Sequence, residues 1–165
     1  KVECPTTYLS TISFQNGSVI RLTLSFDVIA HQRNHIELYG DKGSIIVPDP
    51  NMFGGSVYTC KKLGDPWKEH KTNKMPLGKI NIRSQSSRAN ESSTNSNYRG
   101  AGLAEMAYSI QNKKINKCNG ELSLHILDII QSMMKACKTG KAQSIKTTCK
   151  KPQPFSLKEV KKILK

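Results

Sequence analysis

The chain has 165 residues, of which 36% are hydrophobic, enough for about one domain with an apolar core. No apolar run approaches the roughly 18 residues of a membrane span, and no signal-peptide pattern opens the sequence. The net charge of +14 permits binding to nucleic acid or another anionic surface. The basic residues are spread along the chain, however, with the densest stretch at Lys150–Lys165, and they do not alternate with aromatic residues in the manner of a base-stacking surface. This pattern does not favour nucleic-acid binding.

The first half of the chain is predicted to form strands. From Ile20 to Val28 apolar and polar residues alternate, as in a strand with one buried face. Asn16-Gly17 and Gly40-Asp41-Lys42-Gly43 are turn signals between such segments. Short connections favour an antiparallel meander, because parallel strands need crossovers of about a dozen residues. The predicted strands cover residues 6–14, 20–28, 35–39, 44–47, 56–62 and 67–71.

The second half is predicted to be mainly helical. Residues 81–97, rich in Ser, Asn and Arg, have no periodicity, which predicts a mobile polar loop. Apolar residues recur at helical spacing over 99–113 and again over 121–138. A short strand over 143–147 and a basic helix from about Ser156 complete the prediction. Strands followed by helices, without alternation, indicate an α+β fold over a single domain, residues 1–165.

The cysteines argue against disulfide or zinc chemistry. There are five, an odd number, and no two form a Cys-x-x-Cys pair, so a disulfide framework and a structural zinc site are both disfavoured. This usage fits a reducing cytoplasm. Cys137 falls within an apolar helical pattern and is expected to be a core thiol. The chain begins with Lys1 rather than Met, which favours an excised domain as its origin.

Gly100-Ala101-Gly102 is the nearest approach to a dinucleotide-binding loop. Such a loop needs a preceding hydrophobic strand and a third glycine for packing of the helix on the strand. Here a Ser/Asn-rich segment precedes it, and Glu105 occupies the position of the third glycine. A carboxylate there would repel a pyrophosphate. The pattern is better interpreted as the start of a helix, so no cofactor-binding residues are assigned in this chain.

Four residues are candidates for lining a substrate pocket. His31 lies near a predicted strand end, and Asp27 is a lone carboxylate with no partner visible in the sequence. His31 and His35 would be about 13 Å apart along a strand, too far to chelate one ion easily, and no metal site is predicted. Arg99 precedes a helix and His125 lies early in the next, where a half-buried structural role competes with a site role. No catalytic triad or carboxylate pair is visible, so no catalytic residue is assigned.

Five separated blocks, kept in order, resemble the C-terminal domain of the Gfo/Idh/MocA oxidoreductases. The resemblance spans about residues 2–155, whereas the 81–97 loop and the tail after Phe155 depart from it. The blocks are Ser25–Val28 with Ala30–Gln32, Ile36–Ser44, Val47–Gly55, Arg99–Ala107 and Gly120–Ile129.

The resemblance implies an open, predominantly antiparallel β-sheet with helices packed on one face, of the dihydrodipicolinate-reductase-like kind. It also implies a parent enzyme with an N-terminal Rossmann domain that binds NAD or NADP. The family's catalytic Lys lies in that domain, and its catalytic Asp and His precede the point where this chain begins. The present sequence contains none of these groups. Family substrates are mostly sugars, inositols and related polyols, and the other sheet face commonly forms dimers.

The sequence therefore predicts the substrate-pocket and oligomerisation domain of an NAD(P)-dependent sugar or polyol oxidoreductase, inactive alone. Its expected partners are its own Rossmann domain and further copies of itself, with no membrane partner. One face of the predicted strand is polar, which is compatible with a sheet surface that is exposed or paired with another copy. Its residues are Arg21, Thr23, Ser25 and Asp27. A free-standing interaction module and a basic nucleic-acid-binding domain are the alternatives.

Overall fold

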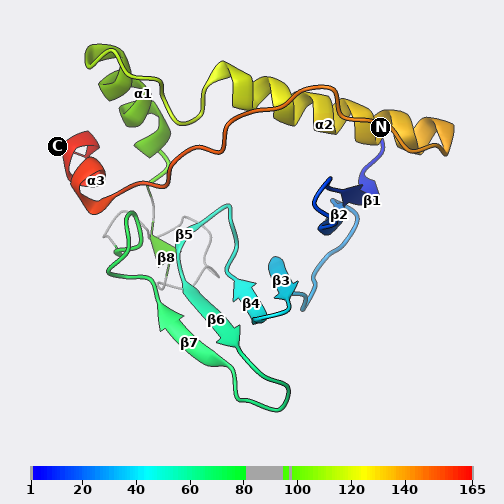
Figure 1. Cartoon of the computed structure of the whole chain (residues 1–165), viewed down its shortest axis with the longest axis horizontal. Helices are drawn as coiled ribbons and strands as arrows, with labels where there is room; N and C mark the ends of the chain where they lie inside the picture. Colours follow the sequence, from blue (N-terminus) through cyan, green and yellow to red (C-terminus); the bar gives the residue numbers. More distant parts are fainter. Residues whose placement is uncertain (1, 81–94, 97, 165) are drawn as a thin grey trace. The chain divides into compact units, whose positions relative to one another are not determined.

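The computed structural model describes residues 2–80, 95–96 and 98–164 (Figure 1). Two compact units divide the chain: Lys1–Arg33 with Leu124–Thr147, and Asn34–Ser123 with Thr148–Lys165. All strand pairs among the described residues are antiparallel, and three helices accompany them. The α+β class and the antiparallel pairing are thus confirmed. The predicted 81–97 loop lies outside the described residues, apart from Asn95 and Ser96.

The first unit contains a β-hairpin. β1 (Thr7–Ser13) pairs with β2 (Val19–Ser25) in register from Thr7↔Ser25 to Ser13↔Val19. The predicted turn is present: Gly17 has φ +85°, and the backbone N–H of Ser18 donates to the Asn16 side chain at 3.0 Å. Along β1, exposed and half-buried residues alternate, as the period-two pattern predicts. One face of the hairpin is therefore partly covered and the other is open.

β2 ends three residues earlier than predicted. The backbone N–H of Asp27 donates to the hydroxyl of Ser25 at 3.1 Å, which turns the chain out of the ladder. The Asp27 carboxylate then accepts hydrogen bonds from the hydroxyls of Thr6 and Thr7, just before and at the start of β1. Side-chain bonds thus replace ladder pairing beyond Ser25. The apolar–polar alternation continues to Val28, but pairing does not.

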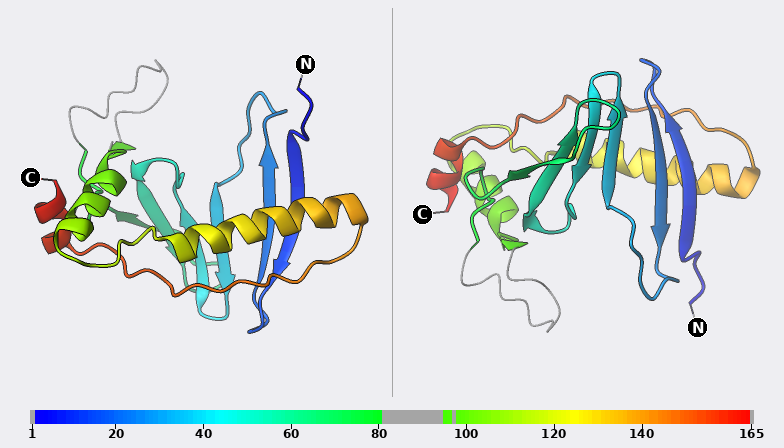
Figure 2. Two further views of the ribbon diagram at one scale, coloured as in Figure 1. Left: turned by 90° about the horizontal axis from the view of Figure 1, so that it is seen from above. Right: turned by 90° about the horizontal axis from the view of Figure 1, so that it is seen from below.

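The long helix α2 (Gly120–Thr139) contributes its residues from Leu124 onward to the first unit. This part of α2 crosses one face of the β1–β2 hairpin (Figure 2). Glu121 lies in the first turn and Lys138 in the last, both favourable to the helix dipole. Gly140, at φ +64°, donates its N–H to Ala136 and ends the helix as predicted. Cys137, in the last turn, is exposed, so the prediction of a core thiol is wrong.

The predicted strand over residues 143–147 is absent: this described segment has no strand pairing. The backbone N–H groups of Lys146 and Thr147 instead donate to the Asp128 side chain, both at 2.9 Å. A carboxylate on α2 thereby takes the place of a neighbouring strand, since buried or half-buried amides need some acceptor. The β-branched residues at 145 and 147 gave the strand-like pattern.

The second unit contains a four-stranded sheet in the order β3-β4-β6-β7, seen side by side in Figure 2. Its strands are β3 (Ile36–Gly40), β4 (Gly43–Val47), β6 (Ser56–Cys60) and β7 (Lys68–Lys71). A separate pair joins β5 (Phe53–Gly54) to β8 (Asn95–Ser96). At the β3–β4 turn Gly43 has φ +132°, and a Cβ there would lie 2.4 Å from the carbonyl oxygen of Cys60. Only glycine fits this approach.

Two helices belong to the second unit. α1 (Ala101–Gln111) contacts α3 (Leu157–Ile163), and α3 begins with a capping box between Ser156 and Glu159. The most buried side chains among the described residues are few and mostly polar: Ser96, Ala101, Glu105 and Ser109. Large apolar side chains are exposed in both units, including Phe26 with 94% of its surface accessible. Such exposed apolar surface is typical of proteins that pack against a partner.

Candidate functional site

Asp27 is held at the end of the β1–β2 hairpin. The Thr6 hydroxyl lies 2.7 Å from both of its carboxylate oxygens, and the Thr7 hydroxyl also donates to it. These bonds, from Thr7 and then Thr6, hold the pKa of the Asp27 carboxyl below its usual value. The side chain is exposed. Asp27 is therefore a preoriented, ionised acceptor whose partners, Thr6 and Thr7, lie about 20 residues away in the sequence.

His31 lies in the connection between β2 and β3, outside any strand, with its side chain exposed. The prediction that it follows a strand end is consistent with this position, although the strand ends at Ser25. His35, four residues later, places its Nε2 3.7 Å from a carboxylate oxygen of Asp49. Among the described residues no group of three or more His, Cys, Asp or Glu side chains could hold a metal ion.

His125 is half-buried on α2 and is the best-organised of the four candidates. Its Nδ1 lies 3.0 Å from the hydroxyl oxygen of Thr147, 22 residues further along the chain. The same hydroxyl lies 2.9 Å from Oδ2 of Asp128. Asp128 also accepts the backbone N–H groups of Thr147 and Lys146. These bonds, led by those from Thr147, lower the pKa of the Asp128 carboxyl.

The network selects which nitrogen of the neutral His125 ring carries the proton. A threonine hydroxyl has one proton, and an ionised carboxylate can only accept. Thr147 therefore donates to Asp128 and accepts from Nδ1–H of His125. In the neutral ring Nε2 is then the acceptor nitrogen, available to a substrate hydroxyl or a bound water. Asp128 is not among the four predicted pocket residues, although its position three residues after His125 puts both on one helix face.

Arg99 immediately precedes α1 in the second unit. Its guanidinium lies 3.5 Å from both the side-chain and the backbone oxygen of Asn51 and 3.9 Å from the sulfur of Met52. Tyr98 anchors this position, because its ring packs edge-on against Phe53 with centroids 5.9 Å apart. Two segments 48 residues apart in sequence thus meet at Arg99.

The four candidates therefore do not form a single described cluster. Asp27, His31 and His125 belong to the first unit, and Arg99 belongs to the second. Asp27 and His125 have separate partners within that first unit, the former two threonines at the hairpin and the latter Thr147. Each is an oriented polar group that could contact a hydroxyl-rich ligand.

The start of α1 does not fit a dinucleotide. Gly100 is the N-cap and Gly102 lies inside the helix, and the strand before them, β8, has only two residues, Asn95 and Ser96. The carboxylate of Glu105 is buried and accepts the backbone N–H of Lys117 and the hydroxyl of Ser109. It holds the connection after α1 in place, where a pyrophosphate-binding loop would need open backbone N–H groups. No cofactor chemistry is derived from this segment.

The described helices include none long and apolar enough to cross a membrane. The chain has no significant match among curated proteins or solved structures. Residues 4–147 match the family model of the Gfo/Idh/MocA oxidoreductases, described as "Oxidoreductase family, C-terminal alpha/beta domain". That match covers most of the chain and includes all five blocks on which the resemblance rests. The chain therefore belongs to the Gfo/Idh/MocA oxidoreductase family, as its C-terminal domain.

Proposed function

We propose that this chain forms the substrate-pocket and oligomerisation domain of an NAD(P)-dependent oxidoreductase acting on a sugar, inositol or related polyol. The observation that carries the proposal is the family match over residues 4–147. A C-terminal domain of this family implies an N-terminal partner domain in the full-length protein. Cofactor binding and hydride transfer are assigned to that partner, so the isolated chain is inactive.

Oriented polar side chains support a pocket for a hydroxylated substrate. Asp27 offers an ionised acceptor, and Nε2 of His125 is an acceptor once Nδ1 donates to Thr147. Arg99 offers guanidinium donors beside Asn51, and His31 adds an exposed imidazole. Sugars and polyols present hydroxyl groups that both donate and accept, so a hydroxyl can bond to Asp27 or His125 of the first unit and, separately, to Arg99 of the second.

The open surface of the first unit supports assembly with a second copy. Arg21 and Thr23 are exposed on one face of β2, and Phe26 projects just beyond its end. Polar residues beside an exposed aromatic side chain are typical of a protein interface, in which the aromatic residue is the anchor and the polar residues form the rim.

All five cysteines are free thiols. Free thiols are typical of a reducing compartment, which supports the cytoplasm as the location.

NADH binding tests whether the cofactor is bound by the N-terminal domain and not by this chain. We expect the 165-residue chain to give no change in NADH fluorescence. The longer protein with its N-terminal domain should bind NADH and, with NAD+ or NADP+ as the hydride acceptor, oxidise a polyol. Saturable NADH binding by the 165-residue chain would contradict the proposal. Failure of the longer protein to use any sugar or polyol, despite binding NADH, would overturn the substrate class alone.

A further inference from the structure

The residues that follow the family match, which ends at Thr147, are strongly basic. Residues 148–165 contain six lysines and one acidic residue, Glu159. The whole chain has 26 basic and 12 acidic residues, so this segment is more one-sided in charge than the chain as a whole. Within it the structure describes the helix α3, which contacts α1 (Figures 1 and 2). The family match therefore does not account for this basic helix.

The three lysines of α3 lie on one side of the helix. Lys158 is followed by Lys161 and Lys162, three and four residues later, and a helix places residues at this spacing on the same side. All three are exposed. Val160 and Ile163, by contrast, are half-buried and mark the covered side of the helix. The three lysines therefore form a single basic surface that is open to solvent.

The protein does not neutralise these three lysines. The acidic residue of α3, Glu159, already has partners, because it accepts the backbone N–H of Ser156 at 2.7 Å and pairs with Lys117 at 3.2 Å. Among the described residues, no ion pair includes any of the three α3 lysines. Like charges at this helical spacing repel one another, and an anionic partner would remove that repulsion.

Two leucines border the basic surface. Leu157 and Leu164 are about two helical turns apart and so lie on one side of α3, with Lys161 between them. Their side chains are 53% and 45% exposed. We call these two leucines, together with Lys158, Lys161 and Lys162, the α3 face. It combines exposed apolar groups with positive charge that the protein leaves unneutralised.

A partner for the α3 face has to be acidic and partly apolar. A second copy of the chain would bring the same lysines and be repelled. Single-stranded nucleic acid is bound by basic residues together with stacking aromatic side chains, and the α3 face contains no aromatic residue. A membrane surface binds helices with a broad apolar face, whereas Val160 and Ile163 are partly covered already. An acidic peptide with apolar residues matches both the lysines and the leucines.

We propose that the α3 face binds an acidic segment of another protein, whose carboxylates contact the lysines while its apolar side chains pack on Leu157 and Leu164. The surface is separate from the substrate pocket of the proposed function, and its role does not depend on the identity of the enzyme's substrate. Acidic charge and apolar groups are both required, because the face offers a contact to each.

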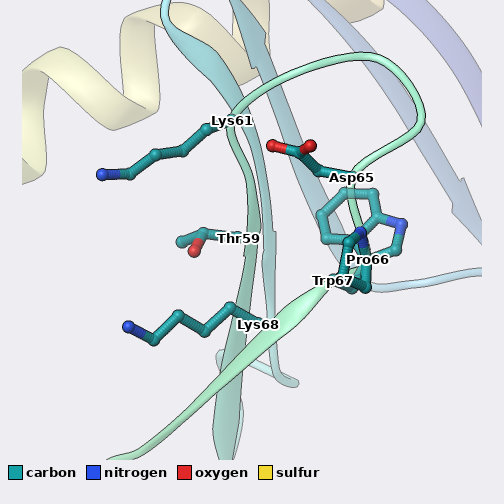
Figure 3. A pocket seen from close by; sticks show the side chains of 6 residues that line it. All are labelled: Thr59, Lys61, Asp65, Pro66, Trp67 and Lys68. Carbon is teal, nitrogen blue, oxygen red and sulfur yellow. The ribbon is translucent and has the colours of Figure 1, made fainter.

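The β6–β7 hairpin supplies lysines for a matched control. Lys61 and Lys68 line a hollow of about 460 Å³ together with Trp67, and their side chains extend away from the indole (Figure 3). These two lysines and Lys71 are exposed and belong to the same unit as α3. Replacing all three by Gln gives the hairpin triple variant, which loses the same charge as a variant without the three α3 lysines. The comparison separates binding by the α3 face from attraction by net charge.

Fluorescence anisotropy of a labelled acidic peptide measures the binding. The probe is a fluorescein-labelled peptide of Glu and Leu residues with helical periodicity, about four turns long. It should bind the 165-residue chain saturably, with a dissociation constant of about 0.1 mM or tighter. Binding should weaken between about 0.1 M and 1 M salt, where the Debye length falls from about 10 Å to 3 Å. Absence of saturable binding would overturn the proposal.

Two altered peptides test what the partner must contain. A peptide with Gln in place of every Glu, and one with Ser in place of every Leu, should each bind about tenfold more weakly. Binding of the Gln peptide as tight as that of the probe would overturn the role of the lysines. Equally tight binding of the Ser peptide would overturn the role of the leucines.

Lysine substitutions test the charged part of the α3 face. Lys158→Gln, Lys161→Gln and Lys162→Gln together should weaken peptide binding about tenfold, whereas the hairpin triple variant should bind nearly as the unaltered chain does. Arg at the same three α3 positions keeps the charge and should retain binding. Circular dichroism confirms that each variant is folded. Equal losses in the two Gln variants would overturn the site, as would tighter binding of a single-stranded oligonucleotide or of phosphatidylserine vesicles.

Leucine substitutions test the apolar part of the α3 face. Leu157→Ala combined with Leu164→Ala should weaken peptide binding about tenfold, because about half of each side chain is available for burial against the peptide. Leu38→Ala combined with Leu63→Ala is the matched control, since it removes two exposed leucines from β3 and from the β6–β7 loop of the same unit. Equal losses in the two double variants would show unspecific apolar adhesion and overturn the site.

Discussion

The carboxylate of Asp128 accepts both the backbone N–H and the side-chain hydroxyl of Thr147, each at 2.9 Å. Nineteen residues separate the two in sequence. The contact ties the segment that follows α2 back to the middle of that helix, and it orients His125 through the same hydroxyl. One carboxylate thus fixes a stretch of irregular backbone and a candidate site residue together.

Replacing Asp128 by Asn is expected to loosen this segment. The amide keeps one acceptor oxygen but loses the charge, and charge-assisted bonds are about twice as strong as neutral ones. The backbone N–H groups of Lys146 and Thr147 should exchange with solvent about tenfold faster in hydrogen-exchange measurements. Asp41→Asn, in the exposed β3–β4 turn, is the matched control and should leave these amides unchanged. Unchanged exchange in Asp128→Asn would show that the observed bonds contribute little.

Acid should destabilise the start of α3, because protonation of Glu159 weakens its capping box with Ser156. Bonds from the Ser156 backbone and side chain, followed by one from Lys117, lower the pKa of Glu159 to about 2 from a usual value of 4.5. A carboxyl whose folded pKa is depressed stabilises the fold fully above its unfolded pKa, and that stabilisation is lost as pH falls through the folded value. The capping box should therefore weaken between about pH 4.5 and 2.

The Glu159→Gln variant isolates this contribution. In the unaltered chain, the NMR signals of the α3 amides should change as protonation of Glu159 weakens the capping box. In Glu159→Gln this contribution to the acid-induced change should be absent. Glu121→Gln, in the first turn of α2, serves as the control and should retain it. An α3 transition of equal size in Glu159→Gln would show that other carboxyl groups are responsible. Asp27 and Asp128, whose pKa values are also lowered, titrate in both proteins and cancel in the comparison.

Arg99 provides a test of the substrate pocket in the longer, cofactor-binding protein. If its guanidinium contacts a substrate hydroxyl or carboxylate, Arg99→Met should raise KM about tenfold and leave kcat nearly unchanged. Arg33→Met, at the exposed β2–β3 connection, is the control. An unaltered KM in Arg99→Met would remove Arg99 from the pocket.

The exposed face of β2 allows a test of assembly. Arg21→Glu reverses a charge on the proposed interface and should shift a homo-oligomer towards monomer in sedimentation experiments, because like or unpaired charges at an interface are costly. Lys135→Glu makes the same charge change on the exposed side of α2 and should leave the assembly intact. A monomeric unaltered protein, or an Arg21→Glu variant with unchanged mass, would contradict assembly through this face.

Local patterns were enough to predict the hairpins and helices. Asn16-Gly17 forms the expected turn, the apolar periodicity gives α1 and α2, and Gly140 ends α2. These features depend on residues within about four positions of one another, so their physical causes are visible in the sequence. The five ordered blocks likewise identified the family before the fold was known.

Only the tertiary structure decided where pairing stops and which polar groups meet. β2 ends at Ser25 because threonines about 20 residues away bind Asp27, and residues 143–147 form no strand because Asp128 takes their amides. Trp67 and Lys61 form one hollow only because the β6–β7 turn folds them together. The turns, the helices and the end of α2 have local causes, so the sequence alone determines them. Contacts between distant side chains depend on how the elements pack, and no local pattern contains that information.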